Sequence, residues 1–489
     1  MALSLTSTGC DSDPSGPHDP SGPEPAEVTL QFIQRLPSMD YVWGSQDPSR
    51  EGWPEQGQMV TWRAHLRNWF QRSVTVEYAW LLDGVEVARG ETDLSAGGGG
   101  FVDLPWTWTF QRHRLAFVLD PGDRLDEESE QNNTLTVFTD ALGVAFYVEQ
   151  GLYDFFRDHQ HRLGNGFSTS WEDWAQRNVA YMNQLFEEAV YPDTPEGVLD
   201  RVRIDGIHIV SDGSITNIRR PNDADRSVDM IWGFRAEEAA WCTDLTNAVP
   251  ANYFYLSPTL SHELGHARYL VDTYAQDVAH DPDKGMVVGL MEGGEPVVDS
   301  PFMPVAYWTT DGKAFVHVAE QIGLMNRDYT RVDPYSAMAL NLIAGHRATR
   351  GNYNDPENLG SFMNDLPTEN RVVLRDQHGQ LLSGATVEVY RSGIFPDPEA
   401  QRLWKQFDDV PDQAGTTFQD GSVLLGRNPF GGAEPIDRWN WSNTVIILRV
   451  QDGLRVGYSF LESLPFNMEF WRGHTELGQY DLTVNMVTP

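Results

Sequence analysis

Residues 257–272 have the sequence Ser-Pro-Thr-Leu-Ser-His-Glu-Leu-Gly-His-Ala-Arg-Tyr-Leu-Val-Asp, and the interpretation of the central part of the chain depends on this stretch. Serine followed by proline is typical of a helix start, because the serine hydroxyl caps free backbone amides and the fixed φ of proline suits the first turn. We therefore predict a helix that begins near Ser257 and carries its chemically active residues inside its first turns.

His262 and His266 are four residues apart, so a helix places both imidazoles on one face, where they can bind a single zinc ion at about 2.0–2.1 Å. Glu263 lies about 100° around the helix from His262, close enough to act on a water at the metal without being a ligand. Such a carboxylate accepts a proton as the water attacks a carbonyl. The pattern predicts zinc-dependent hydrolysis with Glu263 as general base, and an ordinary helix with two surface histidines is the alternative.

A tetrahedral zinc site needs a third protein ligand. The stretch from His262 to Asp272 resembles the metzincin pattern HExxHxxGxxH/D, and Asp272-Thr273-Tyr274 resembles the Asp-x-Tyr ending of secreted bacterial metalloproteases of the snapalysin and immune inhibitor A types. The resemblance implies a metzincin-like α+β domain, a Zn²⁺ cofactor and Asp272 as the third ligand.

The sequence departs from this family at Tyr269, where the family has a glycine that lets the chain leave the helix with positive φ. A bulky residue in that conformation costs on the order of 1 kcal/mol or more. The helix exit is therefore expected to differ from that of the family or to be strained, and the reach of Asp272 depends on which applies.

Glu292 and Glu295 are rival third ligands, at a spacing like that of thermolysin-like enzymes. That arrangement needs the glutamate on a helix, whereas Gly293-Gly294-Glu295-Pro296 is typical of a turn, so Asp272 is favoured. Gly289-Leu290-Met291-Glu292-Gly293 resembles the Met-turn, whose methionine packs beneath the metal in metzincins. The alternative for Met291 is a core methionine before a loop.

The region over 141–368 has an α+β pattern around the metal-binding stretch. Apolar residues at steps of three and four predict an amphipathic helix over 170–190, with Ser170 as its cap. Strands are predicted over 202–210 and 228–234. A further helix is predicted from Asp333-Pro334 through His346, and its expected buried face consists of Met338, Leu342 and Ile343.

Residues 27–140 alternate apolar and polar side chains with a period of two. Asp83-Gly84 predicts a hairpin turn after the strand over 74–82, and Asp120-Pro121-Gly122 closes another strand. Short strands with such turns predict a β-sandwich. The stretch resembles the CARDB family of immunoglobulin-like domains, which implies an extracellular spacer or binding module. The resemblance rests on Leu82-Asp83-Gly84, Asp120-Pro121, Glu127, Glu130, Asn132 and Asn133.

Residues 369–489 return to a strand pattern. The segment from Arg371 through the turn at Asp376–Gly379 to Gly384–Tyr390 resembles the start of a transthyretin-like or carboxypeptidase-regulatory-like sandwich. We predict a second β-sandwich here, with a stabilising or substrate-docking role.

Residues 1–26 are predicted to form a disordered tether, because residues 11–25 are rich in proline, glycine, serine and aspartate. Ser7-Thr8-Gly9-Cys10 resembles the end of a bacterial lipoprotein signal, in which the cysteine is lipidated. Residues 1–9 offer neither a basic nor a sufficiently long apolar region. Either the true start lies upstream of Met1, or Cys10 is unrelated to a signal.

The composition limits the partners of the chain. Its 489 residues include 71 Asp and Glu against 35 Lys and Arg, a net charge of −36, which disfavours nucleic acid and anionic lipid surfaces. Two cysteines, Cys10 and Cys242, exclude a disulfide scaffold and a thiolate zinc cluster. No run approaches the roughly 18 apolar residues of a spanning helix, so membrane contact is expected only through a lipid anchor at Cys10.

These patterns together predict a multidomain chain: an Ig-like β-sandwich over 27–140, a metzincin-like α+β zincin domain over 141–368 and a β-sandwich over 369–489. The expected function is that of an exported or surface-anchored zinc endopeptidase, acting on proteins or peptides that include glycosylated surface proteins. The alternative is a surface adhesion or scaffold protein whose central domain binds metal without cleaving peptides. Cleavage specificity and oligomeric state stay open.

Overall fold

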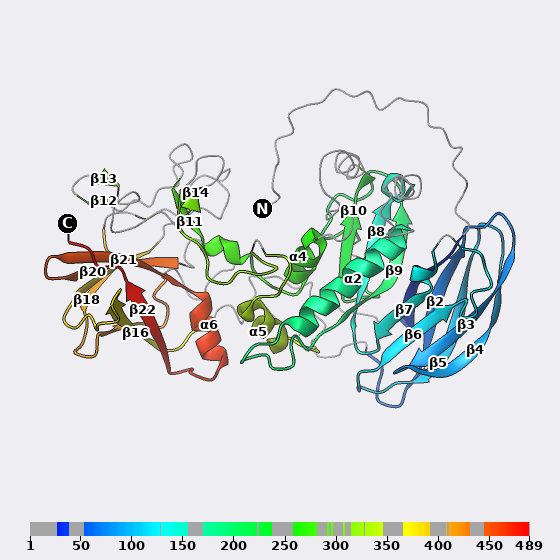
Figure 1. Cartoon of the computed structure of the whole chain (residues 1–489), viewed down its shortest axis with the longest axis horizontal. Coiled ribbons are helices and arrows are strands. Elements are labelled where there is room, and N and C mark those ends of the chain that lie inside the picture. Colours follow the sequence, from blue (N-terminus) through cyan, green and yellow to red (C-terminus); the bar gives the residue numbers. More distant parts are fainter. Residues whose placement is uncertain are drawn as a thin grey trace, which may run out of the picture. The chain divides into compact units, whose positions relative to one another are not determined.

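The computed structural model describes the following residues: 27–38, 53–127, 129–154, 170–222, 224–236, 258–280, 291–292, 295–296, 307–308, 314–326, 328–345, 365–391, 407, 410–430 and 445–488 (Figure 1). Strands predominate over helices among these residues. The chain forms two compact units, with Met1–Gln184, Asp200–Leu264 and Gly345–Arg347 in the first and Leu185–Leu199, Gly265–Ala344 and Ala348–Pro489 in the second. The division into a tether and three domains stays a prediction.

The first unit contains two antiparallel sheets that enclose one apolar core, in agreement with the predicted β-sandwich. The sheets have the orders β1-β2-β5 and β4-β3-β6-β7. Their strands are β1 Val28–Leu36, β2 Met59–Asn68, β3 Val74–Leu82, β4 Val85–Leu94, β5 Gly99–Thr107, β6 Arg114–Leu119 and β7 Thr134–Phe138. Trp62 from one sheet and Trp80 and Phe117 from the other are fully buried in the shared core.

The hairpin predicted at Asp83-Gly84 is confirmed. Leu82 of β3 pairs with Val85 of β4, and both turn residues have positive φ, 49° for Asp83 and 82° for Gly84. Two positive φ values are the signature of the two-residue turn whose twist matches that of the strands it joins. Aspartate and glycine tolerate this conformation, so the local sequence alone specifies the hairpin.

A third sheet of the first unit has the order β10-β8-β9, with all strands parallel. Its strands are β8 Leu142–Glu149, β9 Val202–Val210 and β10 Met230–Phe234, so the predicted strand over 202–210 is confirmed and the one over 228–234 begins two residues later. Helix α2, Trp171–Glu188, packs on the sheet through edge-to-face contacts of Trp171 with Phe146 and Phe234. The predicted cap is confirmed, because the Ser170 hydroxyl accepts a hydrogen bond from the Asp173 amide at 3.0 Å.

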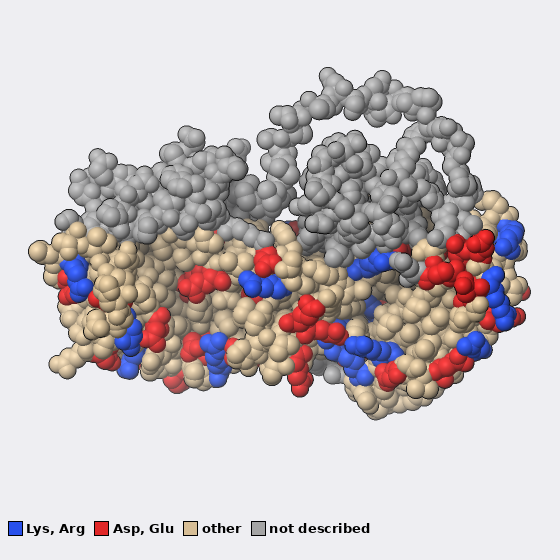
Figure 2. All heavy atoms as spheres, viewed as in Figure 1, with Lys and Arg blue, Asp and Glu red and all other residues tan. Residues whose placement is uncertain are grey.

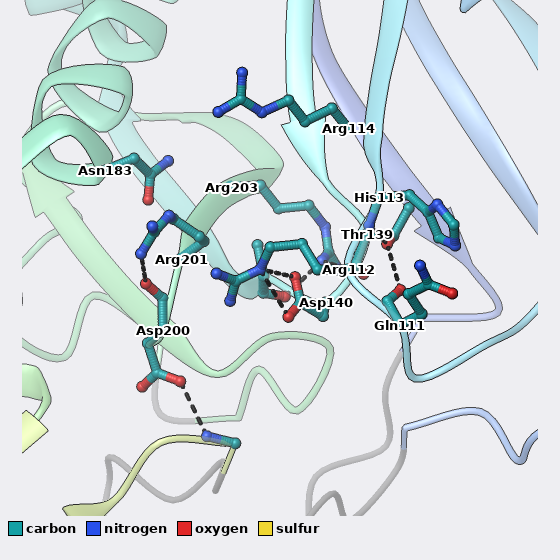
Figure 3. A network of polar contacts seen from close by, with 12 residues as sticks. Gln111, Arg112, His113, Arg114, Thr139, Asp140, Asn183, Asp200, Arg201 and Arg203 are labelled. Carbon is teal, nitrogen blue, oxygen red and sulfur yellow. Dashed lines mark hydrogen bonds and ion pairs between the residues drawn. The ribbon is translucent and has the colours of Figure 1, made fainter. Parts of the chain in front are cut away.

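The sandwich and the parallel sheet β10-β8-β9 meet at a buried ion pair. Arg203 of β9 binds Asp205 through two hydrogen bonds of 2.7 and 2.9 Å, and its guanidinium lies 5.2 Å from the centre of the Trp62 ring. Only 1% of the Arg203 side chain and 6% of the Asp205 side chain are exposed. Figure 3 shows the neighbouring part of this junction, where Arg112 pairs with Asp140 at 2.9 Å.

The second unit contains helix α5, Pro334–Leu342, whose start is as predicted because the Asp333 carboxylate caps the Ser336 amide at 2.9 Å. Met338 and Ile343 are buried, but the prediction for Leu342 is wrong, since it is 43% exposed. The predicted face assumed a helix continuing to His346. The helix ends at Leu342 instead, so this residue lies at the exposed end rather than in the middle of the buried face.

The second unit also contains the C-terminal strands, again as two sheets around one core, in agreement with a β-sandwich. Their orders are β19-β16-β22 and β18-β17-β20-β21. The elements are β16 Glu369–Asp376, β17 Thr386–Arg391, β18 Gln413–Thr416, β19 Ser422–Leu425, β20 Val445–Asp452, β21 Arg455–Glu462, α6 Leu464–Trp471 and β22 Leu477–Val484. Helix α6, inserted between the last two strands, was not predicted.

The surface of the described residues carries mixed charge. On the face drawn in Figure 2, acidic and basic side chains lie close to one another, and no extended basic patch is visible among the coloured residues. No helix within the described residues is long and apolar enough to span a membrane. The predicted tether, Cys10 and Cys242 lie outside the described residues.

Candidate metal centre

Helix α4, Pro258–Ala267, carries the HExxH motif, so the predicted helix is confirmed. Leu260 and Leu264, one turn apart, are buried and anchor the helix in the core. His262 and His266 are also one turn apart and form a second buried row. The three candidate ligands all lie on one stretch of the chain, from α4 to Asp272.

The side chains of His262, His266 and Asp272 come together as a group that could hold a metal ion. One nitrogen or oxygen atom from each residue lies within 4.8 Å of the other two, and all three residues are buried. Nε2 of His266 and Oδ1 of Asp272 are 3.1 Å apart. Ligands at about 2.0–2.1 Å from a tetrahedral zinc lie about 3.3 Å from each other, close to the distance between His266 and Asp272. Two imidazoles and one carboxylate are also a donor set that suits zinc.

The orientation of His266 is set by the backbone. Its Nδ1 lies 2.8 Å from the carbonyl oxygen of Leu270, which has no proton to offer, so Nδ1 carries the proton and donates it. The lone pair of the neutral ring is then on Nε2, the atom that faces Asp272. A backbone acceptor that fixes the tautomer in this way is typical of metal-binding histidines.

The chain leaves α4 through a strained residue. Tyr269 has a φ of +65° and is completely buried. Its amide donates to the His266 carbonyl at 3.0 Å, and the next amide, that of Leu270, donates to the Gly265 carbonyl at 3.1 Å. This is the hydrogen-bond pattern of a Schellman helix end, in which glycine is preferred at the position of Tyr269. Of the two exits expected from the sequence, the structure has the strained one.

The turn after the helix exit places Asp272. Asp272 has an extended backbone, and its carboxylate makes no capping bond to the short helix η4, Thr273–Gln276. The next residue is held twice, because the Thr273 amide donates to the Met325 carbonyl at 3.1 Å and its hydroxyl donates to the Gln321 carbonyl at 2.8 Å. The segment over 321–326 thus fixes the backbone next to Asp272.

Met325 packs on the helix that carries the two histidines, and the sequence analysis missed it. It is completely buried in a tight turn, in which the amide and carbonyl groups of Gly323 and Asn326 are mutually paired. A Cβ atom built on Gly265 would lie 3.0 Å from the Met325 sulfur, so the methionine packs closely on α4 between the two histidine positions. The tripeptide Gly-Leu-Met occurs at 289–291 and again at 323–325, and the second copy was the available signal.

Met291 begins the two-residue strand β12, Met291–Glu292, which pairs with β13, Glu295–Pro296. Both rival ligands therefore belong to one short hairpin rather than to a helix. The side chains of Met291, Glu292 and Glu295 lie outside the described residues, so the predicted place of Met291 beneath the metal stays a prediction.

Glu263 has a partner that the sequence did not indicate. Nη2 of Arg219, from the loop between β9 and β10, lies 3.0 Å from Oε2 of Glu263. The Arg219 side chain is 53% exposed and that of Glu263 is 18% exposed. Glu263 thus lies next to the two candidate metal ligands along α4, faces an arginine and retains some access to solvent.

The chain matches no protein-family model and no curated protein in sequence. Parts of it are similar to solved structures. A CARDB domain from Pyrococcus furiosus in complex with di-metal ions is 15% identical, with 24% of this chain and 92% of that chain covered and a TM-score of 0.18. A domain described as part of a cell surface protein from Methanosarcina acetivorans is 24% identical, with coverages of 22% and 88% and a TM-score of 0.17.

A catechol 1,2-dioxygenase from Acinetobacter radioresistens is 12% identical, with coverages of 27% of this chain and 55% of that chain and a TM-score of 0.14. Each of these similarities covers less than a third of this chain. The chemistry of the metal centre is therefore inferred from its own residues.

Proposed function

We propose that the chain is a zinc-dependent endopeptidase. The observation that carries the proposal is the buried group of His262, His266 and Asp272 with Glu263 beside it on the same helix. Two imidazoles and one carboxylate leave a fourth position of a tetrahedral zinc open, as in catalytic rather than structural zinc sites. The metzincin-like fold of the central domain is part of this proposal.

The zinc ion, when bound, supplies Lewis acidity that polarises a carbonyl and activates water near neutral pH. The residues of the chain perform the remaining tasks. Glu263 accepts a proton from the water while the water oxygen bonds to the carbonyl carbon of the peptide. Glu263 then gives that proton to the leaving nitrogen as the C–N bond breaks. Leu270 keeps His266 in the tautomer that binds metal through Nε2.

We further propose that the enzyme works outside the cytoplasm on proteins or peptides, with glycosylated surface proteins as one substrate class. The tether-like composition of residues 1–26 and the resemblance of Cys10 to a lipidation site support this location. The two sandwiches, which precede and follow the proposed catalytic segment in the sequence, suit spacer or docking roles.

The general base is tested with Glu263→Gln. The purified variant should still bind about one zinc per chain by elemental analysis, while cleavage of casein or a peptide library falls by about 100- to 10,000-fold. Glu196→Gln, at an exposed glutamate, is the matched control and should behave as wild type. Retained hydrolysis in Glu263→Gln would contradict the assignment. A wild-type protein that binds zinc yet cleaves nothing would favour the adhesion or scaffold alternative.

The third ligand is tested by comparing Asp272→Ala with Glu295→Ala. Because Asp272 lies with the two histidines, its loss should reduce bound zinc and abolish hydrolysis, whereas Glu295→Ala should retain both. Elemental analysis after dialysis against a weak chelator gives the result. The reverse outcome would assign the ligand to the hairpin of β12 and β13.

A further inference from the structure

The loop between β9 and β10 is built as a rigid support. The Gly233 amide of β10 donates to the Ile218 carbonyl at 2.7 Å. A Cβ atom on Gly233 would lie 2.9 Å from a methyl carbon of Ile215 and 3.1 Å from Cβ of Pro221. Only glycine permits this approach, so the loop lies directly against the strand.

Two charged side chains fix the start of the same loop. The Glu149 carboxylate accepts a hydrogen bond from the Ile215 amide at 3.0 Å. Arg235 donates from Nε to the Ile215 carbonyl at 3.0 Å and from Nη2 to the Thr216 carbonyl at 2.7 Å. Charged groups bonded to backbone in this way hold a loop more firmly than neutral partners do.

The tip of the loop directs Arg219. The Asn217 side-chain oxygen accepts from the Arg219 amide at 2.9 Å, and the Asn217 carbonyl accepts from the Arg220 amide at 3.1 Å. This local turn presents Arg219, whose Nη2 lies 3.0 Å from Oε2 of Glu263. The loop therefore holds Arg219 in contact with Glu263, the proposed general base.

The guanidinium of Arg219 has more donors than this contact uses. A guanidinium carries five N–H groups, and about half of the Arg219 side chain remains exposed. Its planar fork fits a carboxylate better than any other anion of a peptide.

We propose that Arg219 determines specificity by binding a carboxylate of the peptide substrate close to the scissile bond. The inference rests on the proposed peptidase function. Glu263 must reach the water that attacks the scissile carbonyl, so a guanidinium in contact with Glu263 lies within the length of a side chain from that bond. The carboxylate is either an Asp or Glu side chain or the C-terminus of the peptide.

The test is a set of matched peptides that carry Glu, Gln or Lys at each position flanking the cleaved bond, each with a free or an amidated C-terminus. The wild type should prefer Glu over Gln by about 10- to 100-fold in kcat/KM at one position. If the C-terminal carboxylate is the ligand instead, the preference should separate free from amidated peptides. Arg219→Ala should reduce the ratio to about 1, and Arg219→Glu should shift the preference to Lys.

The ratio of kcat/KM for the acidic and the neutral peptide distinguishes two roles of Arg219, namely binding the substrate carboxylate and positioning Glu263. If Arg219 only positioned Glu263, its loss would change the rates for all peptides by one common factor, and the ratio would stay unchanged. Arg220→Ala is the matched control, since Arg220 is the adjacent exposed arginine, and should keep the wild-type ratio. As a second readout, zinc-loaded Glu263→Gln should bind the preferred acidic peptide more tightly than the neutral one in calorimetry, and a further Arg219→Ala change should remove the difference.

Equal rates for acidic and neutral peptides in the wild type, or an unchanged ratio in Arg219→Ala, would overturn this inference while leaving the peptidase function intact. A wild-type chain that cleaves no peptide in the set or in a proteome-derived library would overturn the proposed function and the inference with it.

Discussion

Each compact unit joins a β-sandwich to neighbouring elements, and the two do so with opposite chemistry. In the first unit, the junction buries the Arg203–Asp205 pair with Arg203 over Trp62. In the second unit, α5 and α6 meet through apolar side chains. The apolar group consists of Val271, Tyr335, Met338, Leu464 and Met468, with Trp471 packed against it.

The comparison shows what each chemistry contributes. A buried ion pair loses much of its Coulomb energy to desolvation, so it adds little net stability, but either charge alone is very unfavourable. The junction of the first unit therefore depends on both partners being present. Apolar packing adds stability in proportion to the area buried and tolerates changes of shape, above all where methionines supply the contact.

The largest expected effect is that of breaking the buried pair. Burial raises the pKa of Asp205 while Arg203 acts to lower it, so the carboxylate and the guanidinium depend on each other. Asp205→Ala leaves Arg203 buried without its partner and should lower the free energy of unfolding of the first unit by about 3–5 kcal/mol. Urea denaturation followed by tryptophan fluorescence measures it.

The matched control removes both charges. Arg203→Met with Asp205→Leu should recover most of the stability, because an apolar pair of similar volume needs no compensation for desolvation. A double variant as unstable as Asp205→Ala would show that the junction depends on its shape rather than on its charges.

The next effect is that of a cavity in the apolar junction. Leu464→Ala should cost about 2–5 kcal/mol in the second unit, because the lost methyl groups are fully buried. Leu464→Met, which conserves volume, should cost less than about 1.5 kcal/mol. Since Val271 of this group precedes Asp272, the proposed third ligand, we also expect Leu464→Ala to weaken zinc binding, measured by chelator competition. Similar losses in both variants would show that this junction is as intolerant as the charged one.

The stability of the first unit is also expected to depend on pH. Burial raises the pKa of Glu127 to about 7, and this carboxyl group accepts a hydrogen bond from the Val28 amide of β1 at 2.7 Å. The folded state holds the proton more tightly than the unfolded state, so its stabilising effect is complete at low pH and is lost as the pH rises from about 4.5 to about 7.

The expected loss is on the order of 1 kcal/mol, since the side chain is partly exposed. Glu127→Gln should flatten this part of the curve, measured by thermal unfolding at a series of pH values. Parallel curves for the wild type and the variant would exclude Glu127 as the cause.

The smallest effect concerns an exposed ion pair of the second unit. Arg472 at the end of α6 binds Asp193 at 2.7 Å, and 37% of the arginine side chain is exposed. Water screens such a pair, so Arg472→Gln should change the free energy of unfolding by no more than about 1 kcal/mol, and less in high salt. A loss comparable to that of Asp205→Ala would show that exposure does not distinguish the two pairs.

Local signals in the sequence predicted several elements correctly. The hairpin at Asp83-Gly84, the cap at Ser170, the strand β9 and the helix α4 each follow from residues adjacent in the chain. Turn geometry, capping and periodicity act over a few residues, so they can be read without the fold. The HExxH spacing similarly places two histidines on one helix face before any tertiary contact is known.

Contacts between residues that are far apart in the chain were not predicted from the sequence. Met325 shares its Gly-Leu-Met tripeptide with Met291, so the sequence pattern alone does not single it out, and its packing on Gly265 is a tertiary contact. The contact of Arg219 with Glu263 joins residues that are 44 positions apart and follows no spacing rule. Leu342 fits the apolar period but lies where the helix ends.

The candidate zinc ligands and the candidate proton acceptor can be identified without a structure, because the chemistry of imidazole and carboxylate groups and the helix period suffice for that. The tertiary structure decided whether Asp272 reaches the histidines. Its place depends on Tyr269 adopting a left-handed conformation that it disfavours when isolated, held by burial and by the segment around Met325. Only the surrounding packing can compensate such strain, so a local sequence pattern does not predict the left-handed conformation of Tyr269.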